Sequence, residues 1–389
     1  MQKPLRIVQA VHAFPPAIGG IETHAFQLSS ALSSLGQKLI IHTTHFKNSK
    51  LSDNGLKQKG IKVKRHFSFS FPGFSSVKFI PFLCFHLLFE RANIYHSHGF
   101  GSPIPIITSI ISFIKRKKFF WTIHGMPKFS GIKQLFVIFY SFFALIPYFL
   151  SRKIICVSEN AKKSLPKKFQ KKAIVIPNGI SAQFLSHSPS KTIPSAPGKF
   201  AAHPPSRGAE KGKFVILYVG RLDSSKGIWV LANAFSEFYK KHPNTILKFV
   251  GPDEGNRKKL QQFARKRSLP IQFSTEPPEN MPSLYSSSSV CVLPSFYEGF
   301  GLSVFESWAC STPAISTPVG AIPEFFSSAF KKEYKKFLFS GINSLLHRLE
   351  FIYSLDSRIL SAYTSKAKKA LSSYQWPIIA KKTLETYRS

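Results

Sequence analysis

The 389-residue sequence predicts an α/β protein of two Rossmann-like, doubly wound domains that face each other across a cleft. Apolar runs of strand length alternate with helix-length segments along most of the chain. The alternation stops once near the middle and then starts again. The runs are almost continuously Ile, Val, Leu and Phe, as expected for strands of a parallel sheet that helices cover on both faces.

The first half of the chain holds five runs that we interpret as buried strands. They are residues 5–12, 38–43, 93–97, 119–123 and 153–157. Between the first two, the segment IETHAFQLSSALSSLG has helical spacing. Its apolar stripe consists of Ile21, Ala25, Leu28, Leu32 and Leu35, and Gly36 is expected just after the last turn. This alternation predicts a first domain over residues 1–182.

A segment without apolar periodicity follows at residues 183–213. It is rich in Pro, Ser, Gly and Lys, which is typical of a linker. The alternation then resumes with five further runs, at residues 214–220, 245–250, 270–273, 289–294 and 313–316. We therefore expect a second domain over residues 214–374, with ligands bound at the carboxyl ends of the strands.

The composition is strongly basic, with 54 Lys and Arg against 18 Asp and Glu and a formal net charge of +36. A positive surface attracts nucleic acid, anionic lipid or phosphorylated substrates, although a solvated basic surface also explains the charge. The 43% hydrophobic content, with 39 Phe, excludes a disordered polycation. The four cysteines form no CxxC pair, which argues against a disulfide framework and a structural zinc site and indicates a reducing compartment. The first strand-like run follows Met1 almost directly, so no secretory signal is expected.

Two of the few carboxylates lie in the segment PSFYEGFGLSVFESWAC, which has the pattern of a strand end, a tight glycine-containing loop and a helix. The helix N-terminus near Leu302 and Ser303 offers free N–H donors and a positive dipole end, which suits a phosphate. Glu306, about one turn further, is within reach of ribose hydroxyls, while Glu298 on the loop can meet the other side of the ligand. The alternative for Glu306 is a solvent-facing position on the helix.

The segment LYVGRLDSSKG follows the first strand of the second domain. It places Arg221 and Lys226 on the loop at the carboxyl end of that strand. Two cations there can neutralise a diphosphate leaving group, whose negative charge grows in the transition state. The alternative is that both are ordinary surface charges.

Six segments of the sequence carry a family resemblance. They are FPPAIGGIETHAFQLSSAL, WTIHG, IICVSENAKKSL, VIPNGI, LYVGRLDSSKGIWVLANAF and PSFYEGFGLSVFESWACSTPAIST. In this order they resemble the family 4, or group 1, glycosyltransferases, which have the GT-B fold; Glu298 and Glu306 match the family's E-x7-E element. The likeness runs from residue 6 to about residue 322. The tail YQWPIIAKKTLETY resembles the family's last helices, which implies that residues 375–389 cross back onto the first domain.

The resemblance implies a retaining hexosyltransferase that moves a sugar from a nucleotide-diphosphate sugar to a glycan, lipid-linked or cell-envelope acceptor. The residues implied at the donor diphosphate are Arg221, Lys226, Gly19 and Gly20, in addition to Leu302 and Ser303 at the helix N-terminus. Glu306 is implied at the ribose, and Glu298 and His124 are implied as catalytic residues beside the donor sugar. The resemblance favours a positioning role for Glu298 over a covalent nucleophile, with the donor phosphate helping to deprotonate the acceptor. Asn178 and Gly179 are implied at the passage between the domains.

No Asp-x-Asp motif occurs, so we expect neither a metal nor another cofactor, the nucleotide sugar being a substrate. The segment HSHG places His96 and His98 on one face of a strand, which would suit a metal ion. The preferred interpretation is that they are satisfied core or cleft histidines. The sequence departs from the family at Gly320-Ala321, where two glycines are common, and at Ser181, where an acidic residue is frequent. These departures leave the donor sugar and the nucleotide base open.

The uncharged segment of residues 134–150 admits three interpretations. It forms a buried helix of the first domain, a helix that enters one lipid leaflet, or a spanning helix, and Pro147 disfavours the last. The basic run at residues 115–118 and six lysines between residues 162 and 172 favour peripheral contact with an anionic membrane. We therefore expect a cytoplasmic enzyme that is peripheral at the cytoplasmic membrane face.

The rival interpretation is a basic polyanion-binding or nucleic-acid-binding protein without transferase activity. The basic clusters lack the interleaved aromatic residues of an RNA-binding motif, so no nucleic-acid partner is expected. A glycan phosphorylase would also use a GT-B fold, but it needs a lysine motif for pyridoxal phosphate that the sequence lacks.

Overall fold

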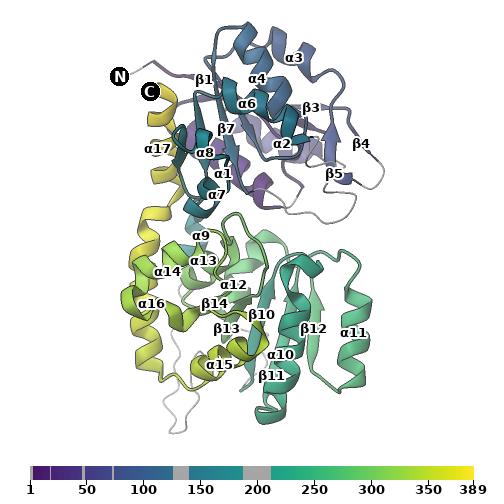
Figure 1. Ribbon diagram of the computed structural model, residues 1–389, viewed down its shortest axis with the longest axis vertical. Coiled ribbons are helices and arrows are strands. Elements are labelled where there is room, and N and C mark those ends of the chain that lie inside the picture. The colour runs from purple at the N-terminus through teal and green to yellow at the C-terminus, as the bar shows by residue number, and fades with distance from the viewer. Residues whose placement is uncertain (1–2, 18, 46–48, 72–73, 126–139, 187–211) are drawn as a thin grey trace. The chain divides into compact units, whose positions relative to one another are not determined.

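The computed structural model describes residues 3–17, 19–45, 49–71, 74–125, 140–186 and 212–389. It divides into two compact units (Figure 1). Unit 1 comprises residues 1–179 and 376–389, and unit 2 comprises residues 180–375. Each unit holds one parallel sheet with helices packed against it, which confirms the predicted α/β class with two doubly wound domains.

The sheet of unit 1 has the order β3-β2-β1-β6-β7-β8-β9, and all its pairs are parallel. Its strands are β1 (Arg6–Ala10), β2 (Lys38–Thr44), β3 (Ile61–His66), β6 (Ile94–His98), β7 (Lys118–Ile123), β8 (Lys153–Cys156) and β9 (Ala173–Val175). The sequence pattern missed only β3 and β9 in this sheet. Both are edge strands. Basic residues interrupt the apolar residues of β3, which reads IKVKRH, and β9 is only three residues long. Strands β2 and β3 are added on one side of β1, and β6 to β9 are added on the other side. The winding direction therefore reverses between β1 and β6.

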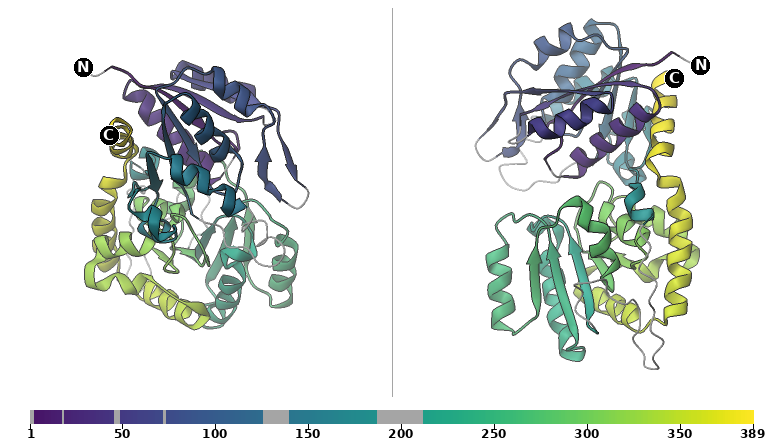
Figure 2. Two further views of the ribbon diagram at one scale, coloured as in Figure 1. Left: turned by 45° about the horizontal axis from the view of Figure 1, so that its top comes forward. Right: turned by 180° about the vertical axis from the view of Figure 1, so that it is seen from behind.

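Two apolar cores lie on the opposite faces of this sheet. Figure 2 shows helices on both sides of it. One face is covered by α1 (Gly20–Ser34) and α17 (Trp376–Arg388), which pack against each other. The other is covered by α3 (Leu83–Phe89), α4 (Ile104–Ile114), α6 (Leu145–Leu150), α7 (Glu159–Lys163) and α8 (Lys167–Gln170). Unit 1 also contains α2 (Ser49–Gln58) and a hairpin of β4 (Phe69–Phe71) and β5 (Phe74–Phe79).

Helix α1 follows the expected stripe, with one exception. Ala25, Leu28 and Leu32 are buried, whereas Leu35 is 40% exposed because the helix ends at residue 34. Gly36 follows with φ +78°, a left-handed conformation that glycine adopts without strain.

Part of the apolar segment 134–150 lies outside the described residues, namely 134–139. In the described part, Tyr140, Ala144 and Tyr148 are buried in the core of unit 1, while Phe142 and Phe149 are exposed. Across the described residues, none of the helices has the length and apolar character needed to cross a membrane.

The sheet of unit 2 has the order β12-β11-β10-β13-β14, again all parallel. Its strands are β10 (Phe214–Val219), β11 (Thr245–Val250), β12 (Ile271–Ser274), β13 (Val290–Leu293) and β14 (Ala314–Ser316), and each falls within one residue of a predicted run. Its α-helices are α9 (Ala182–Leu185), α10 (Ile228–Lys241), α11 (Arg257–Lys266), α12 (Met281–Ser286), α13 (Leu302–Ala309), α14 (Ile322–Phe330), α15 (Gly341–Tyr353) and α16 (Ser357–Leu371). Here the winding direction reverses between β10 and β13.

The boundaries of the units differ slightly from those expected. Residues 183–185 belong to α9, where Phe184 is buried, so the first residues of the expected linker are helical and packed. Residues 187–211 of that linker lie outside the described part of the chain. The chain returns to unit 1 at Trp376, one residue beyond Gln375, the last residue of unit 2.

Candidate functional site

The candidate site of unit 2 lies where β10 and β13 diverge, the position at which doubly wound sheets leave a crevice for ligands. The loop after β10 and the loop after β13 touch there. Gly227 has φ +67°, and a Cβ atom on it would lie 1.9 Å from the carbonyl oxygen of Pro294. The N–H of Phe296 donates a 3.1 Å hydrogen bond to the carbonyl oxygen of Ser225. A glycine at position 227 is therefore what lets the two loops lie against each other.

This contact brings Lys226 and Glu298 together across 72 residues of sequence. Lys226 Nζ lies 2.8 Å from Glu298 Oε1, and Ser295 Oγ donates a second 2.8 Å hydrogen bond to the same oxygen. The two charged side chains are only 20% and 18% exposed, so water screens them weakly. The pair places a cation and a carboxylate, both expected from the sequence, at the reversal point of the sheet.

Arg221 lies on the same loop as Lys226, directly after Gly220. Its Nη1 is 3.5 Å from Glu254 Oε1, and both side chains are about half exposed. An exposed ion pair of this kind contributes little to stability, so the guanidinium can exchange Glu254 for another anion at small cost.

The N-terminus of α13 opens from the loop that carries Glu298. Gly301, with φ +96°, precedes the helix, and a Cβ atom on it would lie 2.6 Å from Ile322 Cδ1. Leu302 and Ser303 are partly exposed and occupy the first turn, where backbone N–H groups have no carbonyl within the helix to pair with. The loop therefore joins a positive helix end to the segment that pairs with Lys226.

Glu306 lies one turn further along α13. Tyr285 of α12 donates a 2.8 Å hydrogen bond to its Oε2. The protein atoms crowded around the carboxyl raise the pKa of Glu306 to about 7, an effect that the tyrosine hydrogen bond partly offsets. Glu306 is thus only partly exposed and has a protein partner, which contradicts the solvent-facing alternative. Sequence reasoning missed Tyr285, because no local motif marks a residue that acts from a neighbouring helix.

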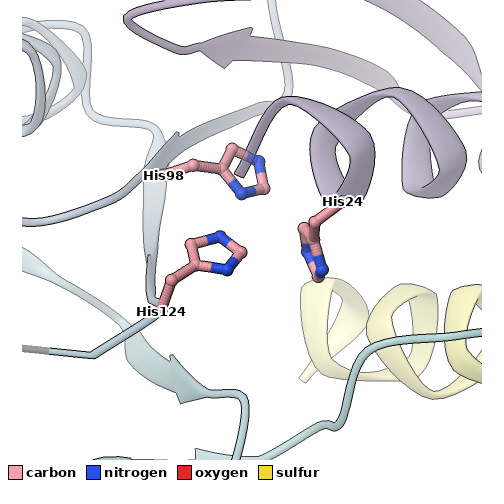
Figure 3. Close-up of side chains that lie close together, drawn as sticks. All are labelled: His24, His98 and His124. Carbon is pink, nitrogen blue, oxygen red and sulfur yellow. The ribbon is translucent and has the colours of Figure 1, made fainter. Parts of the chain in front are cut away.

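His124 belongs to a group of three histidines in unit 1 (Figure 3). His98 ends β6, His124 follows β7, and His24 lies in α1. Ring centroids are 4.6 Å apart for His24 and His124 and 5.3 Å apart for His24 and His98. The group lies near the reversal point between β1 and β6, so it occupies in unit 1 the position that the Lys226–Glu298 pair occupies in unit 2.

The sequence did not single out His24, although it is buried in α1 next to Ala25 of the apolar stripe. His24 Nδ1 lies 2.8 Å from Asn178 Oδ1, so Asn178 supports a histidine rather than only marking the end of unit 1. His96 is satisfied as expected, through Thr122 Oγ1 at 2.7 Å and Tyr387 Oη at 2.6 Å. The same interpretation fails for His98, neither of whose ring nitrogens has a hydrogen-bond partner among the described residues.

The two glycines expected at the diphosphate, Gly19 and Gly20, lie at the N-terminus of α1. Gly19 accepts a 2.9 Å hydrogen bond from Thr23 N–H and has an extended φ of 173°. Gly20 is exposed, and a Cβ atom on it would meet nothing within 4 Å. These glycines and His124 are parts of unit 1, whereas Arg221, Lys226, Glu298 and the α13 residues are parts of unit 2.

The chain matches two family models in sequence order. Residues 18–184 match the model described as Glycosyltransferase Family 4, and residues 200–351 match the model described as Glycosyl transferases group 1. The chain is 23% identical over 386 residues to the phosphatidylinositol N-acetylglucosaminyltransferase GPI3 subunit of Saccharomyces cerevisiae, with 96% of this chain and 80% of that protein covered. It is 25% identical over 392 residues to the corresponding gpi3 subunit of Schizosaccharomyces pombe, with 97% and 79% covered.

Two solved structures agree with the fold. A glycosyltransferase from Rickettsia africae has a TM-score of 0.73 and 19% identity, and covers 99% of this chain and 98% of its own. Anabaena HepE in complex with UDP and glucose has a TM-score of 0.75 and 16% identity, and covers 99% and 100%. Because the two family models together span most of the sequence and the full-length relatives bear glycosyltransferase names, the chain belongs to the family 4, or group 1, glycosyltransferases, which have the GT-B fold.

Proposed function

We propose that this glycosyltransferase moves a sugar from a nucleotide-diphosphate sugar to a lipid-linked glycan acceptor, with retention of configuration and without a metal at the diphosphate. The observation that carries the proposal is the Lys226–Glu298 pair, which lies at the reversal point of the unit 2 sheet beside the N-terminus of α13. In this pair, Lys226 is the cation that would bind the leaving phosphate, and Glu298 is the carboxylate that would bind the sugar.

The donor diphosphate would be bound by Arg221, Lys226 and the N–H groups of Leu302 and Ser303. Each is positioned before the reaction starts, so negative charge that develops on the leaving group meets donors that need no reorganisation. Without a donor, Lys226 is neutralised by Glu298. A bound diphosphate would take over part of that cation and leave Glu298 with Ser295, free to accept hydrogen bonds from sugar hydroxyls.

The nucleoside would lie further along α13. A carboxylate accepts two hydrogen bonds from the vicinal hydroxyls of a ribose, and Glu306 provides one there, oriented by Tyr285. In unit 1, Gly19 and Gly20 would offer backbone N–H groups to the diphosphate. His124 would contact the donor sugar.

We infer that Glu298 positions the sugar, while an oxygen of the donor phosphate takes the acceptor proton on the same face of the ring. Glu298 is hydrogen-bonded to Ser295 and Lys226, and both interactions weaken a carboxylate as a nucleophile. Under this mechanism Glu298→Gln retains part of the transfer rate and Glu298→Ala loses most of it, with no covalent glycosyl-enzyme in mass spectra of either. A glycosylated Glu298 peptide would contradict the positioning role.

A lipid-linked acceptor is supported by the relatives named for transfer to phosphatidylinositol and by the surface of unit 1. Helices α3, α4 and α6 expose Phe85, Phe89, Phe113 and Phe149. A pocket of about 460 Å³ lies at the N-terminal ends of β7 and β8. Its lining residues are Arg116, Lys117, Lys118, Phe119, Leu150, Ser151, Arg152 and Lys172. Exposed aromatic rings next to clustered cations are typical of proteins that bind an anionic membrane surface.

The transferase proposal is tested with nucleotides first. UDP, GDP or ADP that binds only the folded chain raises its unfolding temperature, and the matching radiolabelled nucleotide sugar is then supplied with phosphatidylinositol-containing vesicles. We expect labelled lipid whose anomeric configuration, read by NMR, equals that of the donor. If no nucleotide raises the unfolding temperature while polyanions do, the rival polyanion-binding interpretation is correct.

The membrane proposal is tested by flotation with neutral and anionic vesicles at low and high salt. We expect salt-sensitive binding to anionic vesicles only, and weaker binding for the Phe113→Ala and Phe149→Ala double variant. Ile359→Ala is the matched control, because Ile359 is an exposed apolar residue of α16 in unit 2. Equal binding of neutral and anionic vesicles would contradict the proposed surface.

A further inference from the structure

The histidine group of unit 1 has more ligand capacity than a contact to a donor sugar uses. Each of His24, His98 and His124 offers a ring nitrogen, and these three nitrogens all lie within 4.8 Å of one another. The side chains come from three different elements and point toward a common space, with α17 close to His24 (Figure 3).

Four ring nitrogens of this group lack protein partners among the described residues. His24 Nε2, His98 Nδ1, His98 Nε2 and His124 Nε2 are buried and have no hydrogen-bond partner among the described residues. A buried polar atom without a partner is costly, and such atoms in native proteins commonly mark a bound group. His96, two residues before His98 on the same strand, has both of its ring nitrogens paired. Among the described residues, these three histidines are the group that brings several such nitrogens together.

The group is also prepared to bind a cation chemically. Asn178 Oδ1 accepts a hydrogen bond from His24 Nδ1, and this leaves the lone pair of Nε2 free for the shared space. Metal-binding histidines usually make such a hydrogen bond through the ring nitrogen that does not bind the metal.

We propose that His24, His98 and His124 form a binding site for one divalent transition-metal ion of the Zn²⁺ type. Imidazole nitrogens suit zinc, copper and nickel and do not suit magnesium or calcium. Zinc held by nitrogens at roughly 2.0–2.1 Å in tetrahedral geometry separates them by roughly 3.3 Å. The rings must therefore close by at most roughly 1.5 Å from their present separation, which side-chain rotation can supply. Three histidines leave the fourth tetrahedral position for water or a substrate oxygen.

The ion would compete with the donor sugar, a consequence that rests on the proposed function. His124 Nε2 cannot bind zinc and contact a sugar at the same time. Zinc is therefore expected to weaken the binding of the nucleotide sugar and to leave the binding of the free nucleotide by unit 2 unchanged. The competition concerns the sugar end of the donor, whereas the diphosphate is held by Arg221 and Lys226.

The site is tested on the full chain, purified without a polyhistidine tag, stripped with a chelator and dialysed against Zn²⁺ or Co²⁺. We expect one equivalent of metal by mass spectrometry, and a zinc X-ray absorption spectrum with three imidazole ligands and no sulfur. His98→Ala should lose the stoichiometric metal, and Asn178→Ala should weaken it roughly 10–100-fold. His242→Gln is the matched control, because His242 pairs with Glu350 in unit 2 and should leave the metal content unchanged.

Three results would overturn the proposal: no stoichiometric metal, metal content that His98→Ala leaves unchanged, or a spectrum dominated by oxygen or sulfur ligands. The spectrum of the unsubstituted protein decides the matter even if a histidine variant fails to fold. The outcome is also separable from that of the proposed function, because nucleotide binding by unit 2 is measured on metal-free protein.

Discussion

The buried carboxyl of Glu306 makes the stability of unit 2 depend on pH in a direction that can be measured. Burial raises its pKa from 4.5 to about 7. A raised acid pKa means that the folded state favours the neutral carboxyl. The stabilisation is therefore complete below pH 4.5 and is lost as the pH rises through 7. The substitution Glu306→Gln keeps the shape and an acceptor for Tyr285 but cannot ionise.

The size of the effect follows from the pKa shift. A shift of about 2.5 pH units, at about 1.36 kcal/mol for each unit, sets an upper limit of about 3 kcal/mol. Glu306 is partly exposed, so water reduces this value, and we expect about 1–3 kcal/mol. Glu306→Gln and the unsubstituted protein should therefore be equally stable at pH 4.5, and the variant should be more stable by this amount at pH 8.

The assay is urea-induced unfolding at both pH values, with the difference in midpoint converted to free energy through the common slope. Glu279→Gln, at an exposed glutamate of unit 2, is the matched control for the change from carboxyl to amide. A variant that is less stable than the unsubstituted protein at pH 8, or equally altered at both pH values, would refute the burial argument.

The remaining predictions concern transfer. Lys226→Ala should lower kcat about 10²–10³-fold by removing a charge from the leaving phosphate, whereas Lys266→Ala on the exposed face of α11 should not; equal rates in steady-state assays would contradict the assignment. Gly227→Ala forces a Cβ atom to 1.9 Å from Pro294 O and should abolish transfer and cost more than about 1 kcal/mol in urea unfolding. Gly255 also has a positive φ, +89°, but a Cβ atom on it would meet nothing within 4 Å, so Gly255→Ala adds backbone strain without a clash and should retain transfer. If Gly255→Ala loses transfer as Gly227→Ala does, the clash between the two loops is not the cause of that loss. Chelation with EDTA should not lower the transfer rate, and a loss of rate that only Mg²⁺ restores would show that a metal neutralises the diphosphate.

Several parts of the site were predictable because they depend on local signals. Apolar runs marked the inner strands, and glycines, cations and carboxylates after those runs marked the loops at their carboxyl ends. Glu298, Glu306, Arg221 and Lys226 were all found in this way. Strand β3 was missed because basic residues interrupt its apolar ones, and β9 was missed because it is only three residues long.

Partners from distant segments were not predictable in the same way. Nothing near Lys226 indicates that Glu298 is its partner, and nothing near Glu306 points to Tyr285. The sequence did not single out His24, yet it meets His98 and His124. Each of these contacts depends on the order of the strands in the sheet and on the position that packing gives to each loop.

The sequence by itself determined the two doubly wound domains, the family and the loops that carry the chemistry, because burial and turn formation leave periodic, local traces in the order of residues. Only the tertiary structure decided which charges neutralise each other, which carboxyl is crowded enough to hold its proton near pH 7, and which histidines share one space. Those properties depend on distances of a few ångströms between segments far apart in the chain, and electrostatic and desolvation energies change steeply over such distances.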